Sequence, residues 1–229
     1  ENVFKVLSWT YLTRIENLAY KIINGIFEPF FLLLSGETGR TLLHASSLVR
    51  DGEALLLTGL GGVGKTSTTI ELVLNDDWKY LSDDISLIGK DGTTVFYPRY
   101  VMYYAYNDEG NRILQSKLMK KRSLIDRLHW KVLKRIRGPK GVRRRIPPEV
   151  LYGRDKLGEE GNISIVVYLC RSTSKDFHLL EEDAEELAVK CTNIIATEYY
   201  YYLRYFRFWD STGYSPISVE ETLKYIREI

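Results

Sequence analysis

The chain has 229 residues, of which 45% are hydrophobic and 27% charged, so it can bury the core of one α/β domain of ordinary size. No apolar run approaches the roughly 20 residues that a membrane-spanning helix needs, so no membrane partner is expected. Cys170 and Cys191 are too few for a metal cluster or a disulfide framework, and an intracellular, cytoplasmic location is the expectation. The chain begins at Glu1 without methionine and has no evident secretory signal, which leaves open a segment that precedes it.

The net charge of +2 conceals two regions of opposite sign. From Lys117 to Arg145, thirteen lysines and arginines stand against one acid, Asp126, which gives these residues a charge of +12. The remaining residues must then carry −10. The pattern predicts a basic module on an acidic body, and we call residues 117–145 the basic segment.

The first fifty residues predict one helix followed by two strands. Apolar residues recur at helical spacing over residues 9–23, and Asn24-Gly25 is expected to end that helix. The apolar run over residues 30–34 is typical of a buried strand. A turn over residues 35–39 separates it from a second predicted strand over residues 41–49.

Residues 59–66 read Gly-Leu-Gly-Gly-Val-Gly-Lys-Thr and fit the phosphate-loop pattern at every required position. A hairpin turn at Asp51-Gly52 leads into a short apolar strand before the loop, and helical spacing follows it. Backbone N–H groups of such a loop point at phosphate oxygens, and the helix N-terminus adds partial positive charge. Lys65 would reach the terminal phosphates and the Thr66 hydroxyl would ligate Mg²⁺. The predicted phosphate-binding residues are Gly59, Leu60, Gly61, Gly62, Val63, Gly64, Lys65, Thr66 and Ser67.

The rest of the chain predicts strands, a basic helix and a helical end. The predicted strands cover residues 79–82, 85–88, 94–97 and a central buried strand at 163–169. A hairpin turn at residues 90–92 is expected to join the second of these strands to the third. Within the basic segment Ile125, Leu128, Val132, Leu133 and Ile136 recur at helical spacing, and residues 138–161 read as a loop or lid. Helices are expected over residues 181–196 and 218–229, with an extended aromatic segment over residues 199–209.

Two adjacent acids, Asp83 and Asp84, follow the short strand eighteen and nineteen residues after Lys65. In isolation a surface turn with two solvated acids is the commoner reading of such a pair. Beside a phosphate loop the pair can instead divide two tasks, one carboxylate holding Mg²⁺ and the other accepting a proton from the attacking hydroxyl. We favour the catalytic reading.

Three further residues are candidates for the reacting end of the site. His44 lies in the strand before the hairpin, where the residues alone leave a satisfied core histidine and a catalytic histidine equally open. Phosphoryl transfer also calls for an arginine that neutralises developing charge. Arg99 after Pro98, and Arg171 at the end of the buried strand, are the candidates by position, although either could be a surface arginine.

Three motifs occur in one order: Leu43-His44-Ala-Ser-Ser, the glycine loop, and Leu81-Ser-Asp-Asp84. Together they resemble the kinase core of HPr kinase/phosphorylase, and they are similar to phosphoenolpyruvate carboxykinase, which shares that fold. The resemblance covers residues 41–90 best. It implies a mixed β-sheet flanked by helices, Mg²⁺-dependent use of ATP, and transfer of the γ-phosphoryl group to a hydroxyl. Carried over by motif, His44, Lys65, Asp83 and Asp84 would be catalytic. Thr66 with Asp84 is the metal pair that we name, although the motif does not fix which acid is the base and which the metal ligand.

The basic segment admits three interpretations. The first is an amphipathic helix whose apolar stripe packs on the body, with its basic face over the acidic remainder or a sister subunit of a homo-oligomer. The second is a lid or docking surface for the nucleotide or an anionic acceptor. The third, and least favoured, is a nucleic-acid surface that uses the tyrosines over residues 199–202 for stacking.

These observations predict one α/β kinase domain. Its expected parts are an N-terminal helix and strand (1–40), a nucleotide-binding core (41–110), a basic helical or lid insertion (111–161) and the C-terminal part of the core (162–229). The expected reaction is transfer of phosphate from Mg·ATP to a small hydroxyl metabolite or a protein serine. The alternative is an ATPase switch that binds RNA or another polyanion through the basic segment.

Overall fold

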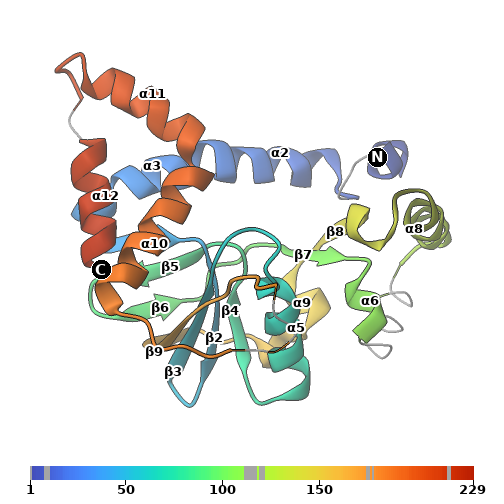
Figure 1. Ribbon diagram of the computed structural model, residues 1–229. Helices are drawn as coiled ribbons and strands as arrows, with labels where there is room; N and C mark the ends of the chain where they lie inside the picture. The colour runs from blue at the N-terminus through green and yellow to red at the C-terminus, as the bar shows by residue number, and fades with distance from the viewer. Residues whose placement is uncertain are drawn as a thin grey trace.

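The structure is a computed structural model that describes residues 2–7, 11–110, 118, 122–173, 176, 178–215 and 218–229. Strands form a seven-stranded mixed sheet with helices packed on both faces, and a separate two-stranded sheet (Figure 1). The strands are β1 (Arg40–Leu43), β2 (Ala45–Arg50), β3 (Glu53–Thr58), β4 (Lys79–Ser82), β5 (Ser86–Gly89), β6 (Thr93–Val95), β7 (Val101–Tyr104), β8 (Arg143–Ile146) and β9 (Glu160–Tyr168).

The α-helices of the described residues include several short ones. They are α1 (Asn2–Leu7), α2 (Arg14–Ile22), α3 (Glu28–Leu33), α4 (Ser35–Thr38), α5 (Lys65–Asn75), α6 (Asn107–Gly110), α8 (Leu124–Arg137), α9 (Pro148–Leu151), α10 (Ala184–Glu198), α11 (Tyr200–Asp210) and α12 (Val219–Glu228). A π-helix, η1 (Ile23–Phe27), joins α2 to α3, and η2 (Pro139–Gly141) and η3 (Arg154–Lys156) are 3₁₀ turns.

The order of strands in the large sheet is β1-β5-β6-β9-β3-β2-β4. Only β3 and β9 run parallel, and every other neighbouring pair in this sheet is antiparallel. The predicted hairpins at Asp51-Gly52 and at residues 90–92 are confirmed as β2–β3 and β5–β6. The α/β class and the mixed sheet with flanking helices therefore agree with the expectation from sequence.

Strands β1–β2 and β4–β5 behave as two long antiparallel strands that bend at the same level. Leu43 pairs with Ser86 and Ser47 pairs with Ser82, so the two ladders share one register on either side of the bend, and the β2–β4 ladder shifts register only beyond Ser47. The bend falls at His44 on one strand and at residues 83–85 on the other. The sequence predicted one continuous strand over residues 41–49, which is wrong because the chain leaves the ladder at His44. The shared bend brings His44 and both acids to one place.

Hydroxyl groups line this bend. Ser47 Oγ lies 2.6 Å from Ser82 Oγ, which lies 2.6 Å from Ser86 Oγ, and the Ser86 hydroxyl donates to the Ala45 carbonyl at 3.0 Å. All three serines are fully buried. Backbone groups at a bend lose their ladder partners, and buried polar groups require replacements. The Ser86 hydroxyl provides one for the Ala45 carbonyl, and the Ser47 and Ser82 hydroxyls extend the chain of hydrogen bonds from it.

Side chains of β3 alternate between two packed layers, as the twofold period of a strand requires. Leu55 and Leu57 pack with Ile70 of α5 on one face. Leu56 faces the opposite layer, where Cys191 of α10 covers it. The predicted strand, loop and helix of the glycine motif are thus confirmed as β3, residues 59–64 and α5.

The N-terminal segment is helical where a strand was predicted. Thr13 caps α2 with a capping box, and the helix continues through η1 and α3 to Leu33 instead of ending at Asn24-Gly25 (Figure 1). Leu32 and Leu33 pack against α10, α11 and α12, and these contacts outweigh the local stop signal. The strand predicted over residues 30–34 is therefore wrong, and with it the helix-and-strand description of residues 1–40. Trp9, the first residue of the predicted helix, lies outside the described residues.

The aromatic run over residues 199–209 is also helical rather than extended, since nearly all of it belongs to α11. Tyr199, Tyr202, Leu203 and Phe206 stand at helical spacing and pack into the helical layer. Tyr201, Tyr205 and Phe208 of the same run are exposed. The predicted helix at the C-terminus is confirmed as α12, with Ser218 as its N-cap.

The basic segment contains α8 and β8, and β8 pairs with β7 in a sheet that the sequence did not predict. Residues 138–161, predicted as a loop or lid, therefore also contain a strand. The expected packing of the apolar stripe of α8 is wrong: Ile125, Leu128, Val132 and Ile136 are 45% to 73% exposed. Trp130 and Asp126 are the residues that α8 buries. Lys117 and residues 119–121 lie outside the described residues.

Strand β9 occupies the predicted central position between β6 and β3, but it is not fully buried. Ile165 is 51% exposed, so the uninterrupted apolar run of this strand does not mean that both of its faces are covered. Among the described residues, no helix combines the length and apolar character needed to cross a bilayer.

Candidate functional site

The glycine loop connects the end of β3 to the start of α5. At Gly59 and Gly64 its backbone adopts conformations that require glycine. Gly59 has a φ of 135°, and a Cβ atom there would lie 2.3 Å from the carbonyl oxygen of Leu169. Gly64 has a φ of 116° and directly precedes the first residue of α5. No atom lies near the Cβ positions of Gly61 and Gly64, so the loop presents open backbone.

Lys65 is buried at the start of α5 and its ammonium points back into the loop. Its Nζ donates to the carbonyls of Gly59 at 2.6 Å and Leu60 at 3.1 Å, and lies 3.0 Å from His44 Nε2. An ammonium has three N–H groups and no lone pair, so we assign Nε2 as the acceptor and place the imidazole proton on Nδ1. Burial lowers the pKa of Lys65, against the opposing effect of Asp84 and Asp83.

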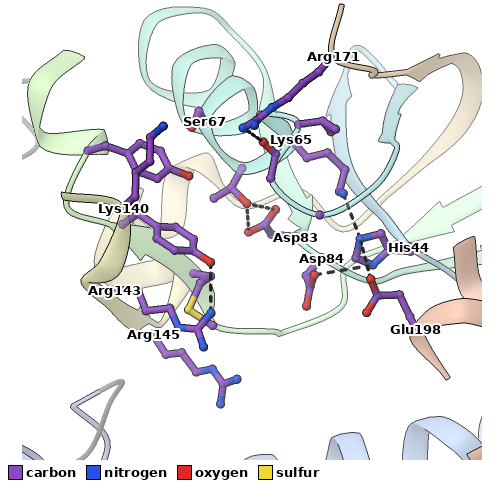
Figure 2. Close-up of a pocket in the computed structure, with 18 of the residues that line it drawn as sticks. His44, Lys65, Ser67, Asp83, Asp84, Lys140, Arg143, Arg145, Arg171 and Glu198 are labelled. Carbon is purple, nitrogen blue, oxygen red and sulfur yellow. Dashed lines mark hydrogen bonds and ion pairs between the residues drawn. The ribbon is translucent and has the colours of Figure 1, made fainter. Parts of the chain in front are cut away.

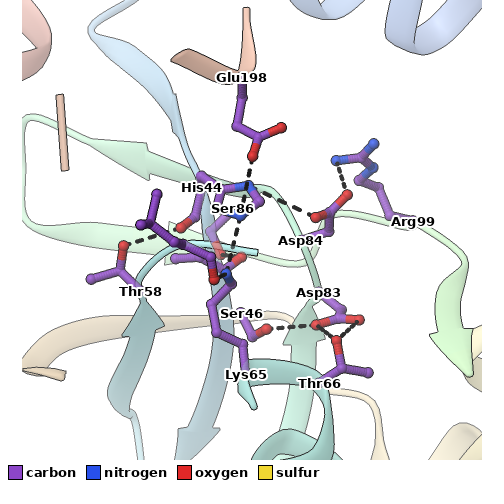
Figure 3. Close-up of polar contacts among 12 residues, drawn as sticks. His44, Ser46, Thr58, Lys65, Thr66, Asp83, Asp84, Ser86, Arg99 and Glu198 are labelled. Carbon is purple, nitrogen blue, oxygen red and sulfur yellow. Dashed lines mark hydrogen bonds and ion pairs between the residues drawn. The ribbon is translucent and has the colours of Figure 1, made fainter. Parts of the chain in front are cut away.

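Asp83 is fully buried and held by hydroxyl groups. The Thr66 hydroxyl reaches both carboxylate oxygens, at 3.1 and 3.0 Å, and the Ser46 hydroxyl donates to Oδ1 at 2.6 Å (Figure 3). Ser46 stands opposite Asp83 across the bend. Burial raises the pKa of Asp83, and the hydrogen bonds from Ser46 and Thr66 oppose this effect.

Asp84 faces away from Thr66, toward the cavity. Its side chain is 53% exposed, its Oδ2 lies 3.3 Å from Arg99 Nη1, and its Oδ1 lies 3.8 Å from His44 Nδ1. Its φ of 72° is left-handed, a conformation that Asp tolerates better than most residues and that is common at functional sites. The metal pair expected from sequence was Thr66 with Asp84. The structure instead brings Asp83 against Thr66.

His44 is buried at the centre of these groups. Burial lowers its pKa, Lys65 lowers it further, and Asp84 and Glu198 act in the opposite direction. Glu198 at the end of α10 lies 4.0 Å from Nε2 (Figure 3). The histidine therefore lies between the glycine-loop lysine and the cavity-facing acid, and it lines the same cavity as both.

The two candidate arginines occupy different places. Arg171 Nη2 donates to the carbonyl of Gly62, so this exposed arginine touches the glycine loop. Arg99 is buried behind Asp84, where its Nε lies 3.5 Å from Glu28 and its Nη2 donates to Tyr20 and Asn24. Arg171 is thus next to the loop, and Arg99 positions Asp84.

One cavity of about 630 Å³ joins these residues (Figure 2). It has a basic wall from the basic segment, where Lys140, Arg143 and Arg145 line it. Because side chains of β8 alternate, Arg143 and Arg145 face the cavity, whereas Arg144 is buried on the opposite face against Asp126 at 3.3 Å. The remaining lining residues that sequence reasoning missed are Tyr20, Met102, Tyr104, Tyr106 and Glu198.

A divalent cation of the magnesium type fits the groups that are present. Mg²⁺ binds through one or two carboxylates together with substrate phosphates rather than in an all-protein cage. The Thr66 hydroxyl and the Asp83 carboxylate are oxygen ligands already in contact. Within the described ranges, no group of three or more His, Cys, Asp or Glu side chains could hold a metal ion.

Comparison with known proteins finds likenesses among solved structures alone. No family model matches the chain, and no curated protein matches it. Among solved structures, the chain is similar to the HPr(Ser) kinase/phosphatase from Coxiella burnetii, with a TM-score of 0.31 and 15% sequence identity. The match covers 60% of this chain and 70% of that one. It names the family that the three sequence motifs resemble, while the functional proposal rests on the geometry of the site.

Proposed function

We propose that this chain is an Mg·ATP-dependent kinase that transfers the γ-phosphoryl group to a hydroxyl. The observation that carries the proposal is the convergence of three units on one cavity: the glycine loop with Lys65, the pair Thr66–Asp83, and the pair His44–Asp84. A glycine turn of purely structural use would not require a buried lysine or a buried acid beside it. The combination matches what phosphoryl transfer needs.

The loop and the first turn of α5 would hold the phosphates. Open backbone at Gly61 and Gly64 and the N-terminus of α5 favour anionic oxygens there. The Lys65 ammonium now satisfies itself on two loop carbonyls, and it can exchange these partners for phosphate oxygens. When bound, Mg²⁺ would neutralise charge on those oxygens, with Thr66 and Asp83 as its protein ligands.

The two acids would then have separate roles. Both oxygens of Asp83 already accept hydrogen bonds from Thr66, which suits a metal ligand. Asp84 is exposed to the cavity and oriented by Arg99, which suits a base that accepts the proton of the attacking hydroxyl. Arg171 at the loop is the better placed of the two arginines to neutralise charge on the transferred group.

The opposite end of the cavity suits the nucleoside. Ser67, the residue after Thr66 in α5, lines this end of the cavity. The side-chain amide of Asn107 donates to the Ser67 hydroxyl at 2.9 Å. The rings of Tyr104 and Tyr106 stack there with centroids 5.2 Å apart and planes at 15°. Tyr104 and Tyr106 line the cavity and offer an aromatic face to a base, and Lys140 and Arg143 line it beside them.

The test is incubation of the chain with γ-³²P-labelled ATP and Mg²⁺ against small hydroxyl metabolites, cell protein and RNA. Label on a metabolite or a protein supports the kinase. Label only in free phosphate, increased by RNA, would refute it and favour the ATPase switch. A Lys65→Ala variant should lose ATP binding, and unchanged binding in that variant would contradict the role of the loop.

A further inference from the structure

A second, smaller pocket of about 220 Å³ adjoins the main cavity. The two share the side chains of Tyr20, His44, Asp84 and Glu198. The smaller pocket extends from the His44–Asp84 pair away from the glycine loop, between η1 and α3 on one side and the start of α11 on the other. A molecule in this pocket would therefore reach the reacting end of the main cavity.

The charge of this small pocket is opposite to that of the basic wall. Three carboxylates line it, from Glu28, Asp84 and Glu198, against one guanidinium, Arg99. Burial lowers the pKa of His44, so the imidazole adds no full positive charge at neutral pH. This balance disfavours an acceptor that carries a carboxylate or phosphate, and it favours a neutral or cationic one.

The three carboxylates are not equally available. Glu28 is buried and already accepts from the hydroxyls of Tyr97 at 3.0 Å and Tyr199 at 2.8 Å, with Arg99 Nε beside it. Asp84 is paired with Arg99 and would serve the reaction. Glu198 is 46% exposed, lies 4.0 Å from His44 Nε2 and interacts electrostatically with Lys65. Of the three carboxylates, Glu198 is thus the most available for a ligand cation.

One buried polar group, a guanidinium nitrogen of Arg99, points to a ligand in this pocket. Arg99 is more than nine-tenths buried, yet its Nη1 makes no hydrogen bond within the described part of the chain: the Asp84 carboxylate lies 3.3 Å away, but without hydrogen-bond geometry. A buried unsatisfied donor is unfavourable unless something else satisfies it. Asn24 lines the pocket from η1, and single π-helical turns in proteins frequently occur at functional sites.

We infer that the small pocket binds the phosphoryl acceptor and that this acceptor is a small amino alcohol, with its ammonium at Glu198 and its hydroxyl beside Asp84. The inference rests on the proposed kinase function. The acceptor oxygen forms a bond to the γ-phosphorus as the bond from that phosphorus to the β,γ-bridging oxygen breaks. The bridging oxygen keeps the electron pair and leaves with ADP. The hydroxyl proton passes to the Asp84 carboxylate, and no atom changes its oxidation state.

The first test uses the unmodified 229-residue chain with two acceptors of the same skeleton. Serinol carries an ammonium on its central carbon, where glycerol carries a hydroxyl. We expect label transfer from γ-³²P-labelled ATP to serinol with a kcat/KM at least ~10-fold above that for glycerol, the size of one charge-assisted hydrogen bond. Equal values for the two acceptors, or transfer to peptide serine alone, would overturn the inference.

The second test measures binding without nucleotide. Calorimetric titration with serinol should give binding to the wild-type chain that is weakened ~10-fold or more in Glu198→Gln. Glu149→Gln, an exposed change on α9 outside both pockets, is the matched control and should bind serinol as the wild type does. Binding that Glu198→Gln leaves unchanged would also overturn the inference.

The two proposals fail in different ways. If the chain transfers label to another hydroxyl compound but does not prefer serinol, only the acceptor inference is wrong. If no acceptor is labelled and ATP binding does not depend on Lys65, the kinase function itself is wrong. The comparison of serinol with glycerol needs no variant, so it is independent of how well Glu198→Gln folds.

Discussion

At the scale of single residues, Asp84 combines an unusual backbone conformation with an exposed carboxylate. Asparagine tolerates the same left-handed conformation, so Asp84→Asn removes the charge without straining the bend. We expect this variant to bind ATP as the wild type does but to lose ~10²- to 10⁴-fold in kcat, the usual contribution of a general base. Single-turnover transfer and equilibrium ATP binding measure the two effects separately.

The control for this prediction is Asp77→Asn, an exposed acid beyond the end of α5. It should change neither quantity. If Asp84→Asn instead weakened ATP binding and left the single-turnover rate unchanged, the carboxylate would act on the nucleotide and not on the acceptor hydroxyl.

His44 makes a second prediction, on the dependence of stability on pH. Its pKa in the folded chain is lowered by burial, whereas in the unfolded chain it titrates near the ordinary value of about 6.5. As the pH falls through this window, the unfolded chain takes up a proton that the folded chain does not. The free energy of unfolding should therefore be full above the unfolded pKa and fall at lower pH, by up to about 1.4 kcal/mol per pH unit.

Urea unfolding of the wild type and of His44→Gln between pH 7.5 and 5.5 tests this prediction. For each chain the free energy of unfolding is plotted against pH, and the difference between the two slopes is the contribution of His44. The pKa of Asp83 is raised in the folded chain, so its effect on stability has the opposite sign. The free energy of unfolding that Asp83 contributes falls as the pH rises above the ordinary value of about 3.8. Identical slopes for the two chains would mean that His44 is protonated equally easily in both states.

Residue types and spacing alone were enough to predict the loop, Lys65, Thr66 and the acid pair. They could not assign Asp83 and Asp84, because neighbouring residues at a bend leave the strand in different directions and only the fold shows which one meets Thr66. Ser46 and Glu198 were missed for a related reason. A serine in a strand and a glutamate at a helix end have no pattern of their own, and their importance comes from register and packing.

At the scale of elements, β8 gives the sharpest contrast, since neighbouring arginines face opposite ways. Arg144→Ala would leave the buried Asp126 with its weaker ion pair to Arg122, at 3.6 Å, and should lower the free energy of unfolding by about 3 kcal/mol. Arg143→Ala should leave stability within about 0.5 kcal/mol and raise the KM for ATP. Thermal unfolding and ATP saturation curves of both variants check this, and similar effects of the two changes would contradict the alternation.

Helix α11 gives a fourth prediction, because its buried and exposed side chains alternate with the spacing of a helix and not of a strand. Leu203→Ala should lower the free energy of unfolding by about 2 to 5 kcal/mol, since this side chain is fully buried in the helical layer. Tyr201→Ala should change it by less than about 0.5 kcal/mol, because that ring is mostly exposed. Comparable losses in chemical denaturation would mean that Tyr201 is packed.

Elements were predictable where local pattern and tertiary packing agree, as in β3, α5 and the two hairpins. They were not where packing overrides the local signal. Asn24-Gly25 usually ends a helix, yet here the chain continues through η1, which places Glu28 where Tyr97, Tyr199 and Arg99 contact it. The run at residues 199–209 was mistaken for a strand because β propensity of tyrosine was weighed above the helical spacing of its packed members.

At the scale of the whole molecule, the site divides into a basic end and an acidic end. Lys140 and Arg143 come from the basic segment, whereas Glu28 and Glu198 come from helices near the two ends of the chain. This division inverts part of the sequence interpretation, in which the basic segment was a candidate surface for an acidic acceptor. The fold instead places Lys140 and Arg143 on the side of the cavity that we assign to the nucleotide, whereas Arg145 lies over the ring of Tyr20.

The shared bend of β1–β2 and β4–β5 has a consequence for how the protein loses its structure. His44, Ser46 and both acids stand on two strands that pair in one register and are tied together by buried hydroxyls. Opening either strand would separate all four groups at once, and it would also break the β1–β5 and β2–β4 pairs at the two ends of the sheet. ATP binding and far-UV circular dichroism should therefore disappear at the same urea concentration, whereas a site carried on mobile loops would fail well before the fold does.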